Sequence, residues 1–124
     1  MTRAITYAQA ICEAAVTLAE RANARAIVAV TRGGGTARRL SALRPRVPIF
    51  ATTDRTDTAR RLAPFFGVTP ICTEISENVS AAGLLIGQQL VRRKLVAPGD
   101  SVVLVSINSD LSRTDANYLK IQTL

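Results

Sequence analysis

The residues of this sequence whose types and spacing are best suited to chemistry are Thr31-Arg32-Gly33-Gly34-Gly35-Thr36. Glycines let backbone N–H groups approach a ligand closely, the threonines offer hydroxyls, and Arg32 offers a guanidinium. An apolar, β-branched run precedes the glycines, and a basic segment with helical spacing follows them. Because a helix N-terminus adds partial positive charge, this strand, turn and helix are expected to bind a phosphate or sulfate group. The alternative is a strand-to-helix connection that binds nothing.

The glycine turn matches neither of two common nucleotide-binding motifs in full. It is not a P-loop, because no lysine follows the last glycine. It matches part of the dinucleotide fingerprint, since Gly33-x-Gly35 is followed by Arg38 where a third glycine belongs. Asp54 stands at the end of the next predicted strand, where that fingerprint has an acidic residue. The pattern therefore favours phosphate binding over the binding of a complete dinucleotide.

Few residues are candidates for catalysis. The chain has no histidine, which excludes a His-dependent triad and the usual zinc sites. The two cysteines have no metal-binding or redox spacing, so both are expected to be buried, reduced thiols. Four aspartates could meet at predicted strand ends, but solvated or helix-capping carboxylates are the favoured interpretation. No catalytic residue, metal site or cofactor is therefore expected; the residues in question are Cys12, Cys72, Asp54, Asp57, Asp110 and Asp115.

The composition indicates one folded domain over residues 1–124. Hydrophobic residues make up 48% of the sequence, and no apolar run is long enough to span a membrane. The N-terminus has no signal-peptide core, so a cytoplasmic protein is expected. The formal charge is +7, and half of the basic residues lie between Arg32 and Arg61, which favours anionic partners. The few aromatic residues are not interleaved with these arginines, which argues against nucleic acid as a partner.

Hydrophobic periodicity predicts the elements that must position the glycine turn. Residues 4–22 have apolar residues at helical spacing, and Asn23 is expected to end that helix. Asp54 is predicted to cap a later helix, with Asp57 near its third position, and Gly67 is predicted to end it. Strands are predicted at residues 26–31, 49–53, 68–73, 102–107 and 118–124. Further helices are predicted at residues 36–43, 54–66 and 79–95, the last capped by Asn78 or Ser80.

This order of elements predicts an α/β fold. Strands that alternate with helices imply right-handed crossovers, a mostly parallel sheet and helices on both faces. Pro70 indicates that the strand at residues 68–73 lies at a sheet edge, because proline cannot donate to a neighbouring strand. The final strand has no helix before it, so it is expected to pair antiparallel at the other edge. In such sheets ligands bind beyond the carboxyl ends of the strands, where the glycine turn stands.

The whole chain, from about Ala4 to its end, resembles the C-terminal α/β domain of pyruvate kinase. The segments that carry the resemblance most clearly are IVAVTRGGGTARRLSALRPRVPIFATT and TARRLAPFFGVTPI, and PGDSVVLVS and ANYLKIQTL support it. Each motif is weak alone, but their order over one domain makes the resemblance specific. It implies a three-layer α/β/α sandwich whose five-stranded sheet is mostly parallel, with an antiparallel last strand.

The resemblance also implies a function. In many pyruvate kinases this domain binds a phosphorylated effector, and the loop matching residues 31–36 holds one phosphate. The domain also forms part of the subunit interface of the tetramer. The resemblance thus implies an allosteric, phosphate-binding and assembly domain, either of this glycolytic phosphotransferase or as a free-standing relative. Its expected partners are a phosphorylated small molecule, or sulfate or phosphate, together with further copies of the chain or the catalytic barrel, which lies outside these residues.

Two departures from the family pattern bear on the effector. Members activated by a sugar bisphosphate have an arginine for the second phosphate, and Ala82 is aligned with that position. They also have a glycine-rich loop before the last strand, whereas residues 107–115 contain three charged residues and no glycine. Because two of these are aspartates, which repel phosphate, one monophosphate or sulfate is favoured over a sugar bisphosphate.

Two further functions remain open at this point. A small nucleotide-binding or phosphometabolite-binding protein could use a similar fold, since fold alone does not decide function. The chain could also be an oligomerisation module that has lost ligand binding. The long helix offers Leu84, Leu85, Ile86 and Val91 on more than one side, which suits the core and an interface alike.

Overall fold

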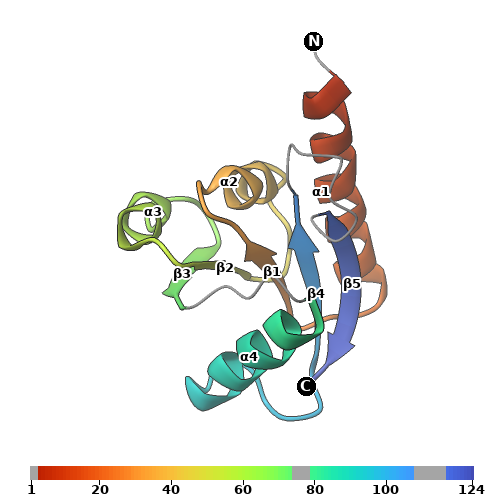
Figure 1. Cartoon of the computed structure of the whole chain (residues 1–124). Coiled ribbons are helices and arrows are strands. Elements are labelled where there is room, and N and C mark those ends of the chain that lie inside the picture. The colour runs from red at the N-terminus through yellow and green to blue at the C-terminus, as the bar shows by residue number, and fades with distance from the viewer. Residues whose placement is uncertain (1–2, 74–78, 108–116) are drawn as a thin grey trace.

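A computed structural model describes residues 3–73, 79–107 and 117–124 of the chain, and Figure 1 shows the arrangement of its elements. The helices are α1 (Arg3–Arg21), α2 (Gly35–Ala42), α3 (Thr56–Leu62) and α4 (Val79–Arg92). The strands are β1 (Ala26–Val30), β2 (Ile49–Thr53), β3 (Val68–Cys72), β4 (Ser101–Ser106) and β5 (Tyr118–Thr123). No helix in these ranges is both long and apolar enough to cross a membrane.

One sheet runs through the molecule in the strand order β3-β2-β1-β4-β5. β1 lies at its centre and pairs in parallel with both β2 and β4. β5 pairs antiparallel with β4, with Val103 opposite Ile121. The predicted sheet is therefore confirmed, including the edge position of Pro70 in β3 and the antiparallel last strand.

Helices cover both faces of the sheet, which confirms the three-layer sandwich (Figure 1). α1, α2 and α3 pack on one face, where Ile27 and Ala29 of β1 point. α4 packs on the other face, against Val28 and Val30. Both sides of β1 are thus buried, which is why every residue of this strand is apolar. The same reasoning explains β4, whose residues 102–105 are all buried.

The end of α1 confirms the role predicted for Asn23. This residue has φ 54°, the left-handed conformation that asparagine tolerates better than most residues. The N–H of Ala24 then donates to the carbonyl of Ala19 at 2.9 Å, which closes the last turn of the helix. Cys12, Ala15 and Ala19 are fully buried, so small side chains bring α1 close to the sheet.

The boundaries predicted for α3 are wrong at both ends. The cap position is Arg55, without a side-chain hydrogen bond, so Asp54 does not cap the helix. Asp57 lies within the first turn, as expected. The helix ends at Leu62 and not near residue 66, because Pro64 lacks the N–H that the next turn needs. Gly67, at φ 71°, does not end the helix but turns the chain into β3.

Three smaller expectations need correction or lie beyond the structure. Ser80 is inside α4 and so is not its cap, and Asn78 lies outside the described residues. α4 ends at Arg92, before residue 95, and Lys94 with φ 60° turns the chain out of the helix. Cys12 is buried as expected, but Cys72 is exposed, because it lies on the edge strand β3.

Candidate phosphate-binding loop

The glycine turn lies at the carboxyl end of β1, the central strand. From β1 the chain moves to β2 on one side, and it later returns across the sheet to β4 on the other side. α2, which follows β1, and α4, which precedes β4, therefore lie on opposite faces of the sheet. Ligands of open α/β sheets bind beyond the carboxyl ends of the strands at such switch points. Residues 31–36 stand at this point, as the sequence predicts.

The first part of the loop is held by its own hydrogen bonds. Thr31 is buried, and its Oγ1 accepts a hydrogen bond from the N–H of Gly34 at 2.9 Å. The N–H of Thr31 donates to the carbonyl of Thr52 in β2 at 3.0 Å. The Thr31 hydroxyl therefore shapes the turn, a role that the sequence analysis did not assign to it.

The fold requires glycine at one of the three glycine positions of the loop and not at the other two. Gly34 has φ 89°, and a Cβ there would lie 3.0 Å from Cδ2 of Leu62, so the fold itself requires glycine. Gly33 and Gly35 have no positive φ, and a Cβ at either would meet no atom within 4 Å. Neither backbone conformation nor packing among the described residues explains these two glycines. Close approach of a ligand to the backbone would explain them.

The start of α2 presents backbone donors beside the glycines. α2 begins at Gly35, and the N–H of Arg38 donates to the carbonyl of Gly34 at 3.0 Å, the first bond of the helix. The N–H groups before it have no carbonyl in the preceding turn to bind. Among the residues in the described ranges, none accepts from the N–H of Gly35 or Thr36. These two donors are therefore available to an anion.

Contacts with α3 hold the glycine loop in place. The hydroxyl of Thr58, which is buried, donates to the carbonyl of Arg32 at 2.6 Å. The side chain of Leu62 packs against Gly34. The sequence analysis missed Thr58, because its partner lies 26 residues away in the chain and no local pattern indicates the contact.

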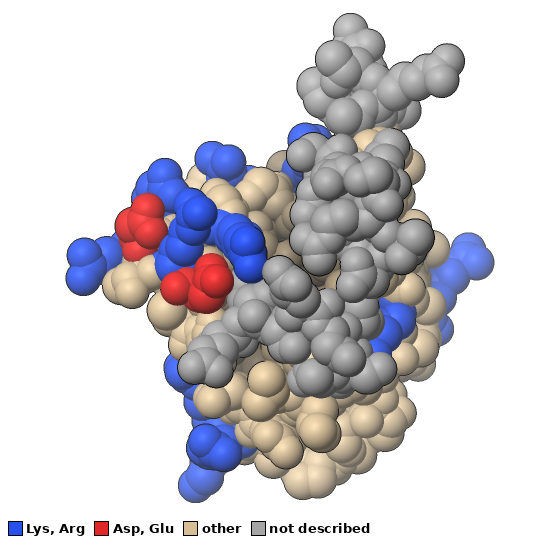
Figure 2. All heavy atoms as spheres, in the orientation of Figure 1, with Lys and Arg blue, Asp and Glu red and all other residues tan. Residues whose placement is uncertain are grey.

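Basic side chains gather around the loop. Figure 2 shows Lys and Arg groups clustered over α2 and α3, with acidic groups among them. Arg32 is well exposed, and its Nε lies 3.9 Å from Oδ2 of Asp54. Further along, Arg61 pairs with Asp57 at 3.5 Å within α3. Arg38, Arg55 and Arg60 are also exposed. The surroundings of the loop are therefore positively charged overall, with one carboxylate close to Arg32.

Catalytic groups are scarce in the described part of the chain. Asp54 and Asp57 each face an arginine and not each other. Burial raises the pKa of the Cys12 thiol to about 11, so this cysteine is a poor nucleophile at neutral pH. In residues 3–73, 79–107 and 117–124, no three potential metal ligands come together. Ala82 is buried in α4, and Asp110 and Asp115 lie outside the described residues.

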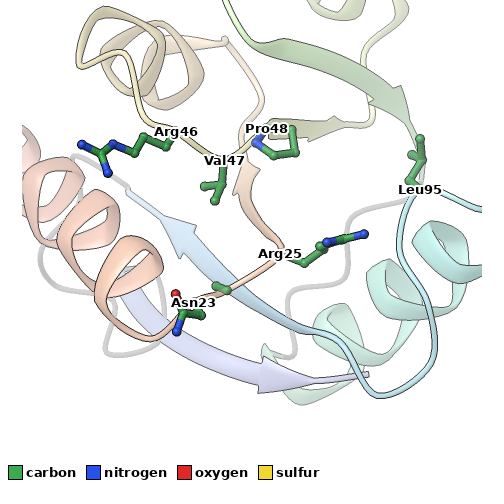
Figure 3. Close-up of a pocket in the computed structure, with 7 residues that line it drawn as sticks. Asn23, Arg25, Arg46, Val47, Pro48 and Leu95 are labelled. Carbon is green, nitrogen blue, oxygen red and sulfur yellow. The ribbon is translucent and has the colours of Figure 1, made fainter.

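A hollow of about 420 Å³ lies at the end of the sheet opposite to the glycine loop (Figure 3). Its arginines, Arg25 and Arg46, extend toward opposite sides of the hollow and do not converge on one point. Arg25 also has a carboxylate partner, because its Nε lies 3.8 Å from Oδ2 of Asp100. The two arginines of the hollow therefore do not form a single anion site. It is lined by Asn23, Ala24, Arg25, Arg46, Val47, Pro48 and Leu95.

Comparisons with known proteins agree with the fold. Residues 9–122 match the family model described as pyruvate kinase, alpha/beta domain. The chain is 35% identical over 101 residues to a pyruvate kinase of Methylorubrum extorquens, covering 82% of this chain and 21% of that protein. It is 37% identical over 113 residues to one of Agrobacterium vitis, covering 90% and 23%. The chain thus spans about a fifth of the length of these relatives.

Solved structures are similar over nearly the whole chain. A crystal structure of a pyruvate kinase from Cryptosporidium parvum superposes with a TM-score of 0.80 at 27% sequence identity. The superposition covers 94% of this chain and 22% of the other. The similarity in sequence and the similarity in structure therefore identify the same kind of domain.

Proposed function

Because the chain belongs to the pyruvate kinase α/β domain family, we propose that it binds the phosphate group of an effector and is not catalytic by itself. The loop that forms the site consists of Thr31, Arg32, Gly33, Gly34, Gly35 and Thr36. One observation carries the proposal. The open N–H groups of Gly35 and Thr36 stand beside two glycines that the described fold does not otherwise require, at the switch point of the sheet.

Each part of the loop has a role in this proposal. The N–H groups at the start of α2 donate to the phosphate oxygens, and the helix N-terminus supplies partial positive charge. Arg32 supplies a full charge from the exposed side. Thr31 and Thr58 do not contact the ligand but hold the loop in shape through Gly34 and the carbonyl of Arg32.

We further propose that phosphate binding is regulatory and that the domain takes part in assembly, in the cytoplasm. Its partners would be further copies of the chain or the barrel domain of a pyruvate kinase. Binding can change an activity elsewhere only by favouring one arrangement of domains or subunits over another. On α4, Leu84 is 62% exposed and Leu85 is 41% exposed, which supports a contact surface on this helix.

A thermal-shift titration with orthophosphate, sulfate and sugar phosphates tests phosphate binding. A ligand at about 100 times its Kd stabilises the folded chain by about 2.7 kcal/mol, which raises Tm measurably. Thr36→Glu places a negative charge in the site, so we expect it to abolish the shift. Thr69→Glu, an exposed threonine on β3, is the matched control and retains the shift.

Thr36 is buried, so a charge at this position can also remove the shift by unfolding the chain. A second variant at an accessible position separates the two causes. Gly35→Asp puts a carboxylate in the first turn of α2, where acidic residues stabilise helices and a Cβ has open space. We expect this variant to fold with an unchanged or raised Tm and to lose the ligand shift, whereas neutral Gly35→Asn retains part of it. A full ligand shift in folded Gly35→Asp would contradict phosphate binding at this loop.

A further inference from the structure

The hollow at the amino end of the sheet is built into the folded backbone (Figure 3). Its volume of about 420 Å³ is within the range of clefts that bind ligands, roughly 300–1,000 Å³. Backbone hydrogen bonds fix its walls. The N–H of Ile27 donates to the carbonyl of Pro48 at 3.0 Å, and the N–H of Arg25 donates to the carbonyl of Ser101 at 2.7 Å. A partner therefore finds the hollow already formed.

Part of the lining is apolar surface that the described fold leaves uncovered. Val47 lies between Arg46 and Arg25 in Figure 3, with Pro48 beside it. Val47 and Leu95 are half-buried, and Pro48 is exposed. Apolar surface that is rimmed by charged residues is typical of a surface that another protein covers. An apolar side chain gains free energy by leaving water here, whereas a phosphate group does not.

The rim of the hollow is basic. Arg46 and Arg25 extend toward opposite sides of it. Among the residues that the structure describes, no carboxylate pairs with the side chain of Arg46. Arg25 meets Asp100 only in an exposed pair, at 3.8 Å. The segment that brings Leu95 to the hollow also carries the exposed Lys94. Positive charge therefore stands on both sides of the apolar lining.

The carboxylates near the rim already hold the backbone. Glu20 accepts the N–H of Arg46 at 3.2 Å, and Asp100 accepts the N–H of Ala97 at 2.8 Å. The exposed pair between Arg25 and Asp100 contributes little to stability. The fold therefore does not require the charges of the two arginines, and the rim keeps the capacity to bind further carboxylates.

We propose that this hollow docks an acidic segment of another protein. An apolar side chain of that segment fills the space beside Val47, and carboxylates on its two sides pair with Arg46 and Arg25. An extended segment advances by about 3.3 Å per residue, so its flanking carboxylates reach arginines that point apart. One small anion cannot meet both arginines. This inference does not depend on phosphate binding at the opposite end of the sheet.

Two other occupants fit the hollow less well. The apolar lining is concave, whereas proteins that bind a bilayer surface insert a protruding apolar face. A second copy of the chain carries the same formal charge of +7, so two copies repel each other. An acidic protein segment meets both requirements, because it complements the charge and can enter the hollow.

Calorimetric titration of the chain with capped synthetic peptides tests the proposal. The parent peptide has one leucine with two glutamates on each side. We expect serine in place of leucine to weaken binding at least about tenfold, because the burial of the apolar side chain is lost. We expect glutamine in place of all the glutamates to weaken binding at least about tenfold as well, because the charge-assisted hydrogen bonds are lost.

Arginine variants test the two sides of the hollow separately. Two further peptides keep the glutamates only before or only after the leucine. We expect Arg46→Gln to weaken one of them about fivefold and Arg25→Gln to weaken the other about fivefold, because each arginine serves one side. Arg60→Gln is the control, since it removes an exposed charge on α3 that does not line the hollow. It should leave every affinity within about twofold. Thermal melts check that all three variants fold.

Several outcomes would overturn the proposal. One is that the parent peptide does not bind, and another is that the serine peptide binds equally well, which would mean attraction by charge alone. A third is that both arginine variants weaken both half-acidic peptides equally. Binding of phosphatidylserine vesicles, or self-association, that is lost in Arg46→Gln would assign the surface to a membrane or to a second copy. Phosphate binding at the glycine loop is tested independently, by Gly35→Asp.

Discussion

At the scale of single residues, the three glycines of the loop separate a folding requirement from a binding requirement. The sequence predicts the run as a unit and assigns all six residues 31–36 to the ligand. The structure shows that Gly34 is required by its φ of 89° and by Leu62, and that Thr31 accepts a hydrogen bond from Gly34. Residue types alone could not separate these roles, because they depend on contacts with Leu62 and Thr58 in α3, which are distant in the chain.

Alanine substitutions should distinguish the glycines. We expect Gly34→Ala to lower the free energy of unfolding by about 1–3 kcal/mol, because alanine is strained at this φ and its methyl crowds Leu62. Gly33→Ala should change stability by less than about 0.5 kcal/mol, since its Cβ meets open space. Urea denaturation of both variants measures this. Equal losses for the two would show that the loop conformation described here is wrong.

The buried thiol of Cys12 leads to a prediction about how the free energy of unfolding depends on pH. Burial raises its pKa to about 11 in the folded chain, compared with 9.0 for an ordinary thiol. Between these values the unfolded chain loses this proton and the folded chain keeps it, so stability is intact below pH 9.0 and falls as pH rises toward about 11. We expect Cys12→Ala to flatten the dependence of unfolding free energy on pH in this range. A pH dependence that is the same in both proteins would refute this assignment.

At the scale of helices and strands, hydrophobic periodicity predicts which elements exist and their order along the chain. It predicts less well the residues at which they begin and end. Every predicted strand is present. β1 and β4 are the clearest cases, because strands buried on both faces must be apolar throughout. The end of α1 is predicted well because Asn23 both breaks the pattern and adopts the left-handed conformation. The ends of α3 are predicted poorly. Asp54 has the right type for a cap but faces Arg32, and Pro64 ends the helix before Gly67 does.

The leucines of α4 raise a question about the role of a whole helix. The sequence pattern alone does not decide whether they lie in the core or at an interface. The structure buries Ile86 in the core and leaves Leu84 and Leu85 exposed on another side of the helix. We expect the double change Leu84→Glu and Leu85→Glu to shift an oligomer toward a folded monomer. Sedimentation velocity over a range of concentrations measures it. Gln88→Glu, also exposed on α4, is the control and should leave the distribution unchanged.

At the scale of the whole molecule, the strand order explains why the loop is where ligands bind. The alternation of helices and strands predicts a mostly parallel sheet, and the sequence predicts the antiparallel β5 because no helical pattern precedes it. The order of the strands is not encoded in any local pattern. It emerges because α4 carries the chain back over the opposite face, which sets β4 beside β1 and places the switch point of the sheet at residues 31–36. The shared fold therefore supports the position of the site, and the chemistry of the loop supports its ligand.

A titration of the isotope-labelled chain with orthophosphate, followed by the amide resonances, tests the central claim most directly. The account predicts saturable shifts concentrated on the N–H groups of residues 33–37, which disappear in Gly35→Asp and persist in Gly35→Asn. Resonances of the hollow at the other end of the sheet, including those of Asn23 and Arg25, should not move. An absence of saturable shifts in the loop, or shifts centred on that hollow, would contradict the account.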